Sequence, residues 1–192
     1  MDKLQIANEK WNLEIANASD FLDTPDDLSD FELKYNLAEP NIVTCSLSLS
    51  CKTEGGQRDC LILAGGAPTG VNQHSALLLG EALYLAIGNQ VCNFSLPSLD
   101  LLWHKKSDSA ACLGLYTTPA QDCLIVHGEC EITRLALDGH QEWIAGGRDI
   151  FNEGFQLSGT QIEVIDFNHV HYRIDLSNGQ IEMLKDHPEK VK

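Results

Sequence analysis

The chain of 192 residues is 43% hydrophobic and 21% charged, which are ordinary values for a globular protein and exclude disorder over most of its length. Its 28 acidic and 13 basic residues give a formal net charge of −15. Such a surface repels nucleic-acid phosphates and anionic membranes, so we expect neither as a partner, and a basic protein suits the charge better.

The leader and cysteine patterns indicate the cellular compartment. No charged segment followed by an apolar core begins the chain, and no apolar run approaches the roughly 18 residues that a spanning helix needs. The 7 cysteines include no C-x-x-C pair. Most lie in apolar runs, where cysteine acts as a small buried hydrophobe. These features predict a cytoplasmic protein without a disulfide framework.

The first 74 residues are expected to form an irregular segment packed on the rest of the chain. Thr24 can cap a helix and Pro25 suits its first position, which predicts a short helix over residues 25–31. Apolar runs predict strands at 31–37, 41–51 and 59–64. One acidic run is interpreted either as the solvated face of the helix or as a patch for a basic partner: Asp20, Asp23, Asp26, Asp27 and Asp30.

A glycine-rich stretch, AGGAPTG at 64–70, follows the last of these strands. It lacks the Lys-Ser/Thr pair of a phosphate-binding loop and the spacing of a dinucleotide-binding fingerprint. We interpret it as a flexible loop at the rim of a binding face.

The remainder of the chain repeats with a period of 40 residues. Large side chains mark the period late in each unit, at Trp103, Trp143 and Met183. Turn residues keep the same step in two further rows, one of Gly88, Gly128 and Asn168 and one of Gly139 and Gly179. Three rows on one period predict three copies of one structural unit, at about 75–110, 111–150 and 151–187.

Each unit is expected to contain four short strands. The Asp-Gly and Asn-Gly pairs between apolar runs mark hairpins, because both central positions of the favoured turn need a positive φ. The predicted strands are 76–79, 82–87, 91–96 and 101–104 in the first unit, 112–116, 123–127, 130–137 and 141–145 in the second, and 155–158, 161–167, 170–176 and 180–184 in the third.

Four-stranded units of this length with a late Trp are typical of β-propeller blades. The segment LALDGHQEW at 135–143 resembles the repeat of quinoprotein-type propellers, and the resemblance extends over about 75–184. The third unit lacks the Trp, and the first has Pro97-Ser98-Leu99 where the others have Asp-Gly or Asn-Gly. The resemblance implies the blade architecture alone, and we assign no cofactor.

The expected fold class is therefore all-β and propeller-like. A closed ring typically needs four to eight blades, so three units do not close one. The N-terminal segment 1–74 then forms a degenerate fourth blade, or the three units of 75–192 form an open array whose edges are covered by that segment or by a second protomer. Both alternatives describe one structural domain.

Two rows of polar residues lie one period apart and form the candidate binding site. Glu129 and Glu131 align with His169 and His171, and residues i and i+2 of a strand point the same way, so both pairs are expected at equivalent edges of neighbouring units. Two His and a carboxylate suit a divalent metal ion. The same residues are also expected where polar and apolar side chains alternate on a half-solvated strand. We assign no metal. His127 ends an apolar strand, where it is bonded to backbone or takes part in a site.

The sequence contains no G-x-S-x-G elbow or phosphate loop. This favours a non-enzymatic protein-interaction or binding module, with an acidic immunity or inhibitor-type role of the bacterial kind, against a basic partner, as its sharper form. The alternative is a small-molecule or metal-binding protein, extending to a hydrolase, that uses the two polar rows. A third interpretation is an assembly part that forms a homo-oligomer.

Overall fold

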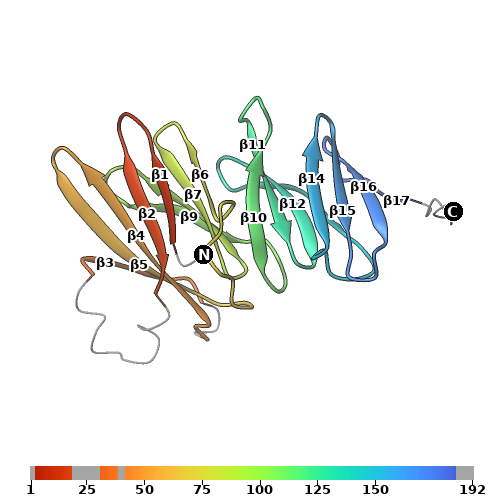
Figure 1. Cartoon of the computed structure of the whole chain (residues 1–192), viewed down its shortest axis with the longest axis horizontal. Coiled ribbons are helices and arrows are strands. Elements are labelled where there is room, and N and C mark those ends of the chain that lie inside the picture. The colour runs from red at the N-terminus through yellow and green to blue at the C-terminus, as the bar shows by residue number, and fades with distance from the viewer. Residues whose placement is uncertain (1–2, 19–30, 39–41, 185–192) are drawn as a thin grey trace, which may run out of the picture.

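The computed structural model describes residues 3–18, 31–38 and 42–184 as four β-sheets standing side by side in a row (Figure 1). The N-terminal sheet lies at one end of the row and the third repeat at the other. The described residues contain strands and no helix, which confirms the predicted all-β fold class. The helix expected at 25–31 and the acidic run between residues 20 and 30 lie outside the described residues, except for Phe31.

Each repeat forms one antiparallel sheet whose strands follow the chain in order. Asp-Gly, Asn-Gly and similar short turns connect apolar strands of about six residues, which is why local patterns place them well. The first repeat contains β6 (Ala76–Leu79), β7 (Ala82–Ile87), β8 (Gln90–Ser95) and β9 (Leu101–Lys106). The second contains β10 (Cys112–Thr117), β11 (Cys123–Gly128), β12 (Glu131–Ala136) and β13 (Gln141–Gly146). The third contains β14 (Gly154–Ser158), β15 (Gln161–Ile165), β16 (His171–Asp175) and β17 (Ile181–Met183).

The N-terminal sheet is a five-stranded mixed sheet with the order β1-β2-β4-β5-β3. Its strand β3 pairs in parallel with β5, and the other pairs are antiparallel. The sequence prediction missed β1 and β2. The strand expected from residue 41 begins at 45. The strands are β1 (Lys3–Ala7), β2 (Asn12–Asn17), β3 (Leu33–Asn36), β4 (Cys45–Thr53) and β5 (Gly56–Ala64).

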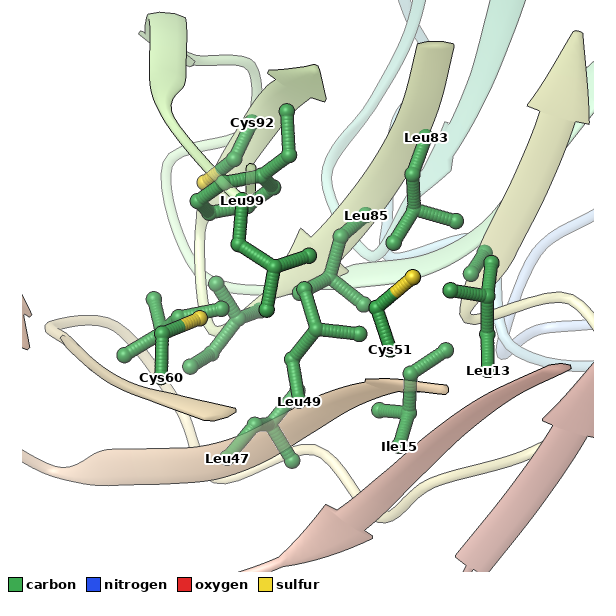
Figure 2. Close-up of a cluster of buried hydrophobic side chains, with 14 of the residues drawn as sticks. Leu13, Ile15, Leu47, Leu49, Cys51, Cys60, Leu83, Leu85, Cys92 and Leu99 are labelled. Atoms are coloured by element: carbon green, nitrogen blue, oxygen red, sulfur yellow. The ribbon is translucent and has the colours of Figure 1, made fainter. Parts of the chain in front are cut away.

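An apolar core fills each space between neighbouring sheets. Figure 2 shows Leu13 and Leu49 of the N-terminal sheet near Leu83 and Leu85 of the first repeat, all of them fully buried. Similar cores join the first repeat to the second and the second to the third. Because β7 and β11 contact a neighbour on both faces, they are buried along almost their whole length.

The cysteines are part of these cores. All seven are free thiols and six of them are buried, which confirms their interpretation as small hydrophobes. Burial raises the pKa of the Cys60 thiol to about 12, and the pKa of Cys112 also lies well above its ordinary value. Thiolates are the reactive form of cysteine, so these buried thiols are chemically inert.

The marker residues of the 40-residue period connect one repeat to the next. The indole Nε1 of Trp103 donates to Leu137 O in the second repeat (3.1 Å), and a Cβ at Gly139 would lie 2.8 Å from the Trp103 ring. The turn glycine is therefore required so that the next repeat can close over the Trp. The residues that mark the 40-residue period therefore form contacts between repeats as well as the turns and strands within each repeat.

The same contact recurs one repeat later and then ends. Trp143 Nε1 donates to Leu176 O (3.0 Å), and its ring lies against Gly179. Met183 occupies the Trp position of the third repeat and is 43% exposed. No described sheet lies beyond it, so the described chain has no acceptor there for an indole N–H.

Tyr35 takes the place of the Trp in the N-terminal sheet. Its hydroxyl donates to Leu99 O (2.9 Å) in the turn between β8 and β9, the same turn that receives a Trp in the later repeats. Leu99 has φ 58°, like the glycines at this place, and is fully buried. Pro97-Ser98-Leu99 therefore builds the expected turn from different residues. The N-terminal segment thus adds a fourth sheet to the row, five-stranded and mixed where the predicted degenerate blade has four strands.

Candidate functional site: a groove on the connection face

The connections between sheets and the turns between the second and third strands of each repeat lie together on one face. We call this surface the connection face: the connections 65–75, 107–111 and 147–153 and the turns 88–89, 129–130 and 166–170. Main-chain hydrogen bonds join them across repeats. Examples are Asn89 N to Gly65 O (3.1 Å), Glu129 N to Ala111 O (2.8 Å) and Phe167 N to Ile150 O (2.8 Å). Each connection is thereby fixed to the next repeat.

Two hollows on this face form the candidate site, which we call the groove. The larger has a volume of about 330 Å³ and is lined by Ala67, Pro68, Thr69, Gly70, Asn72, Ala111, Leu113, Glu129 and Asn152. The smaller has a volume of about 160 Å³ and is lined by Asn17, Thr44, Cys45, Ser46, Pro68, Thr69 and Gly70. Residues 68–70, which we call the strap, line both hollows. The strap belongs to the glycine-rich loop that the sequence places at a binding rim.

Short-range contacts hold the strap in place. Ala67 N donates to Ala110 O (2.8 Å), and Gly88 N donates to Thr69 Oγ1 (3.2 Å). Gly88 has φ +54°, and a Cβ there would lie 2.0 Å from Gly65 O. The marker glycine of the first repeat is thus explained, because only glycine permits this approach.

A carboxylate that the sequence analysis missed holds the middle of the connection face. Asp108 is buried, and its Oδ1 accepts the N–H groups of Ala110 (2.6 Å) and Ala111 (2.8 Å). Its Oδ2 accepts those of Cys130 (2.9 Å) and Glu131 (2.8 Å) in the second repeat. Burial, with a smaller contribution from the Glu131 carboxyl, raises the pKa of this carboxyl to about 6, although the backbone N–H groups act to lower it. A local signal existed, since Asp followed by small residues is typical of a side chain that caps its own turn.

Among the described residues, one group of three side chains is close enough to hold a metal: Asp108, Cys130 and Glu131. Both oxygens of Asp108 already accept two backbone N–H groups each. Glu131 in turn accepts Ser109 N (2.9 Å) and the Ser109 hydroxyl. The donor set is therefore engaged in holding the connection, and we assign it a structural role.

The structure places the predicted polar pairs at equivalent turns of neighbouring repeats. Glu129 and Glu131 flank the turn between β11 and β12, and His169 and His171 flank the turn between β15 and β16. The strand argument for their direction was wrong, because Glu129 and His169 lie in the turns, His169 with φ 59°. Glu131 belongs to the three-residue group just described, and the other three residues do not. Of the four, Glu129 lines the groove.

His127 is buried between the second and third repeats. Its Nε2 lies 2.8 Å from Phe151 O, and burial lowers the pKa of the ring. It begins a stack of rings that the sequence did not reveal, with centroids 4.6 Å apart for His127 and Phe155, 4.3 Å for Phe155 and Tyr116, and 4.5 Å for Tyr116 and His74. A neutral His that donates to a backbone carbonyl suits this environment.

The fold and this loop-lined face define an all-β, propeller-like scaffold. The chain is similar to the β-propeller domain of Myceliophteria thermophila Cps50 (Swd1), with a TM-score of 0.52 and 12% identity over 72% of this chain and 57% of that one. It is also similar to U3-55K, with a TM-score of 0.47 and 15% identity over 62% and 41% of the two chains. For the N-terminal domain of Nup159 the TM-score is 0.46 and the identity 11%, over 62% and 35% of the chains.

At these identities the likeness shows the fold alone, and the argument rests on the Swd1 domain, of which the match spans 57%. No protein-family model and no curated protein sequence matches this chain significantly. The propeller part of the sequence resemblance is confirmed, and its quinoprotein part stays a prediction. In the described residues no helix has the length and apolar character needed to cross a membrane.

Proposed function

We propose that the chain is a non-enzymatic protein-binding module that engages a basic partner through the groove. The observation that carries the proposal is the composition of the larger hollow: it extends over loops of three sheets, and Glu129 is its one ionisable lining residue. A rigid platform with a single carboxylate in a shallow hollow suits recognition of a cationic side chain. The net charge of −15 favours the approach of such a partner.

The state of the reactive side chains supports a binding role over catalysis. Burial raises the pKa of Cys60 and Cys112, so their thiolates are unavailable at neutral pH. His127 is bonded to Phe151 O, and Asp108 is bonded to four backbone N–H groups. We also propose that segments 1–74 and 75–192 form one structural domain, since one apolar core joins the N-terminal sheet to the first repeat.

Fluorescence anisotropy with labelled hexalysine and hexaglutamate peptides tests the proposal. We expect hexalysine to bind, with an affinity that falls as salt rises, and hexaglutamate not to bind. Glu129→Gln should weaken hexalysine binding about 3- to 10-fold, because a partly buried charged hydrogen bond contributes about 1 kcal/mol.

Glu182→Gln is the matched control, since Glu182 is an exposed carboxylate on β17 outside the groove. Equal losses in both variants would show that net charge alone attracts the peptide and would overturn the assignment to the groove. The immunity or inhibitor-type role and the cytoplasmic location stay predictions, the former resting on net charge. The metal-binding alternative gains no support, because the His pair stands outside the one described ligand group.

A further inference from the structure

The smaller hollow contains a buried hydroxyl without a partner. Ser46 is 3% exposed, it lines the hollow, and its Oγ makes no hydrogen bond within the described part of the chain. Leaving a buried polar atom unpaired is costly, and such atoms are rare in folded proteins. A hydroxyl that has one donor and two acceptor sites therefore suggests an external partner.

The residues that line the smaller hollow with Ser46 are uncharged, and three of them, Asn17, Thr44 and Thr69, carry polar side chains. Asn17 contributes an exposed amide, and Thr69 Oγ1 accepts Gly88 N and retains its own hydrogen for donation. None of the lining residues of this hollow carries a full charge at neutral pH. Its chemistry suits a small side chain that both donates and accepts hydrogen bonds.

The strap connects this neutral hollow to the hollow that contains Glu129. Pro68, Thr69 and Gly70 line both sides, and the space beside Gly70 is open, with no atom within 4 Å of a Cβ placed there. A ligand that crosses the strap at Gly70 can therefore reach both hollows. The two sites differ in charge, so they select for two different groups on one ligand.

We propose that the groove binds an extended peptide segment of the partner that crosses the strap. A Lys or Arg of this segment lies beside Glu129, and a Ser, Thr or Asn enters the smaller hollow and bonds to Ser46 Oγ. The inference rests on the proposed function and adds the two-position sequence preference. An extended chain suits the shape because its side chains leave at regular intervals along a line.

A peptide array tests this preference directly. Acetylated octapeptides on a Gly-Ala background carry one Lys at a fixed position and one Ser, Thr, Asn or Val at each other position in turn. We expect the hydrogen-bonding residues to exceed Val about 3- to 10-fold at one or two spacings from Lys, as one hydrogen bond of about 1 kcal/mol provides. Ser46→Val should abolish this spacing preference and keep the dependence on Lys. Glu129→Gln should weaken the dependence on Lys and keep the preference for hydrogen-bonding residues over Val, which is then no longer tied to a spacing from Lys.

Two controls separate binding from folding. Ser48→Val changes a half-buried serine on the same strand that does not line the groove, and it should leave both preferences intact. Ser46→Ala should melt no lower than the wild type, since it removes an unpaired hydroxyl.

The outcomes distinguish the inference from the function on which it rests. Loss of the Lys dependence in the wild type overturns the proposed function. Lys dependence without a spacing preference, or a spacing preference that survives Ser46→Val, overturns the two-position inference alone.

Discussion

The Asp108 carboxylate lies so close to the main chain of Gly128 that no residue with a Cβ would fit at position 128 without a shift. A Cβ at Gly128 would lie 2.1 Å from Asp108 Oδ2 and 2.5 Å from Glu131 O. We expect Gly128→Ala to destabilise the fold by about 2–4 kcal/mol, because it displaces a buried carboxylate from its four N–H donors. Urea unfolding measures the loss.

Gly146→Ala on β13 is the control, because a Cβ there would lie an ordinary 3.7 Å from its nearest neighbour, Cys130 O. It should cost no more than about 0.5 kcal/mol. Similar losses in both variants would contradict the role of the Asp108 contact.

The protonation of Asp108 links stability to pH. Burial raises its pKa from the ordinary 3.8 to about 6, so the folded chain binds this proton more tightly than the unfolded chain does. The stabilisation is fully present below pH 3.8 and is lost as the pH rises through about 6. We expect the unfolding free energy of the wild type, relative to Asp108→Asn, to fall by about 1–3 kcal/mol over this range.

Two measurements check this sign. The carboxyl carbon shift of Asp108 in NMR should titrate with a midpoint near 6, and urea unfolding at several pH values should give the falling difference. A difference that grows with pH would mean that the four N–H donors outweigh burial and keep the group ionised.

The sequence could indicate Glu129 and the glycine-rich loop that contains the strap, but not the other residues of the groove. Glu129 follows Gly128, a residue of the repeating pattern, so its place on an equivalent turn could be predicted. A local pattern indicates that Asp108 caps its own turn, but its bonds to the second repeat and the position of Ser46 beside the strap involve segments 22 or more residues away along the chain. A local sequence pattern cannot predict an unpaired hydroxyl or a stack of four rings, because both depend on residues that are distant along the chain.

At the scale of elements, the Trp contact predicts an asymmetry between repeats. Trp143 packs on Gly179 and donates to Leu176 O, whereas Met183 at the same position of the third repeat is half-exposed. Trp143→Leu should destabilise the fold by about 2–4 kcal/mol, because it leaves a cavity between two repeats and removes the indole hydrogen bond to Leu176 O, which then keeps Arg134 as its donor. Met183→Leu should change stability by less than about 0.5 kcal/mol. Thermal unfolding of the two variants compares them, and equal effects would contradict the interlocking role of the Trp.

The repeats could be placed from the sequence nearly to the residue, whereas in the N-terminal sheet β3, β4 and β5 could be placed and β1, β2 and the strand order could not. In the repeats each strand pairs with the next across a short turn, so the residues of each hairpin are enough to place its strands. In the first sheet the turn between β1 and β2 has no Gly or Pro, and Asn8 Oδ1 holds it by accepting Lys10 N and Trp11 N. The place of β3 depends on its parallel pairing with β5 and on the contact of Tyr35 with Leu99, both distant along the chain.

At the scale of the molecule, the four described sheets form an open row with different inner and outer faces (Figure 1). The inner faces are continuous apolar cores. On the third repeat, β15 buries Ile162 and Val164 inward and exposes Gln161 and Glu163 outward. Glu163 pairs there with Arg173 of β16 (3.4 Å). A polar outer face is typical of the terminal unit of a stacked array, where it prevents further stacking.

This difference between faces predicts how the row associates. The wild type should be monomeric by light scattering, because β15 presents Gln161 and Glu163 outward and Met183 is the one large hydrophobic side chain exposed on the described strands of the third repeat. The double variant Glu163→Val and Arg173→Leu replaces this ion pair with apolar side chains, so the outer face of the third repeat becomes apolar like the inner faces. This variant should self-associate. The reversed pair, Glu163→Arg with Arg173→Glu, keeps the polarity and should stay monomeric. A wild type that dimerises while the apolar variant does not would mean that copies join through the ion pair of this face, and it would favour the assembly interpretation of the sequence.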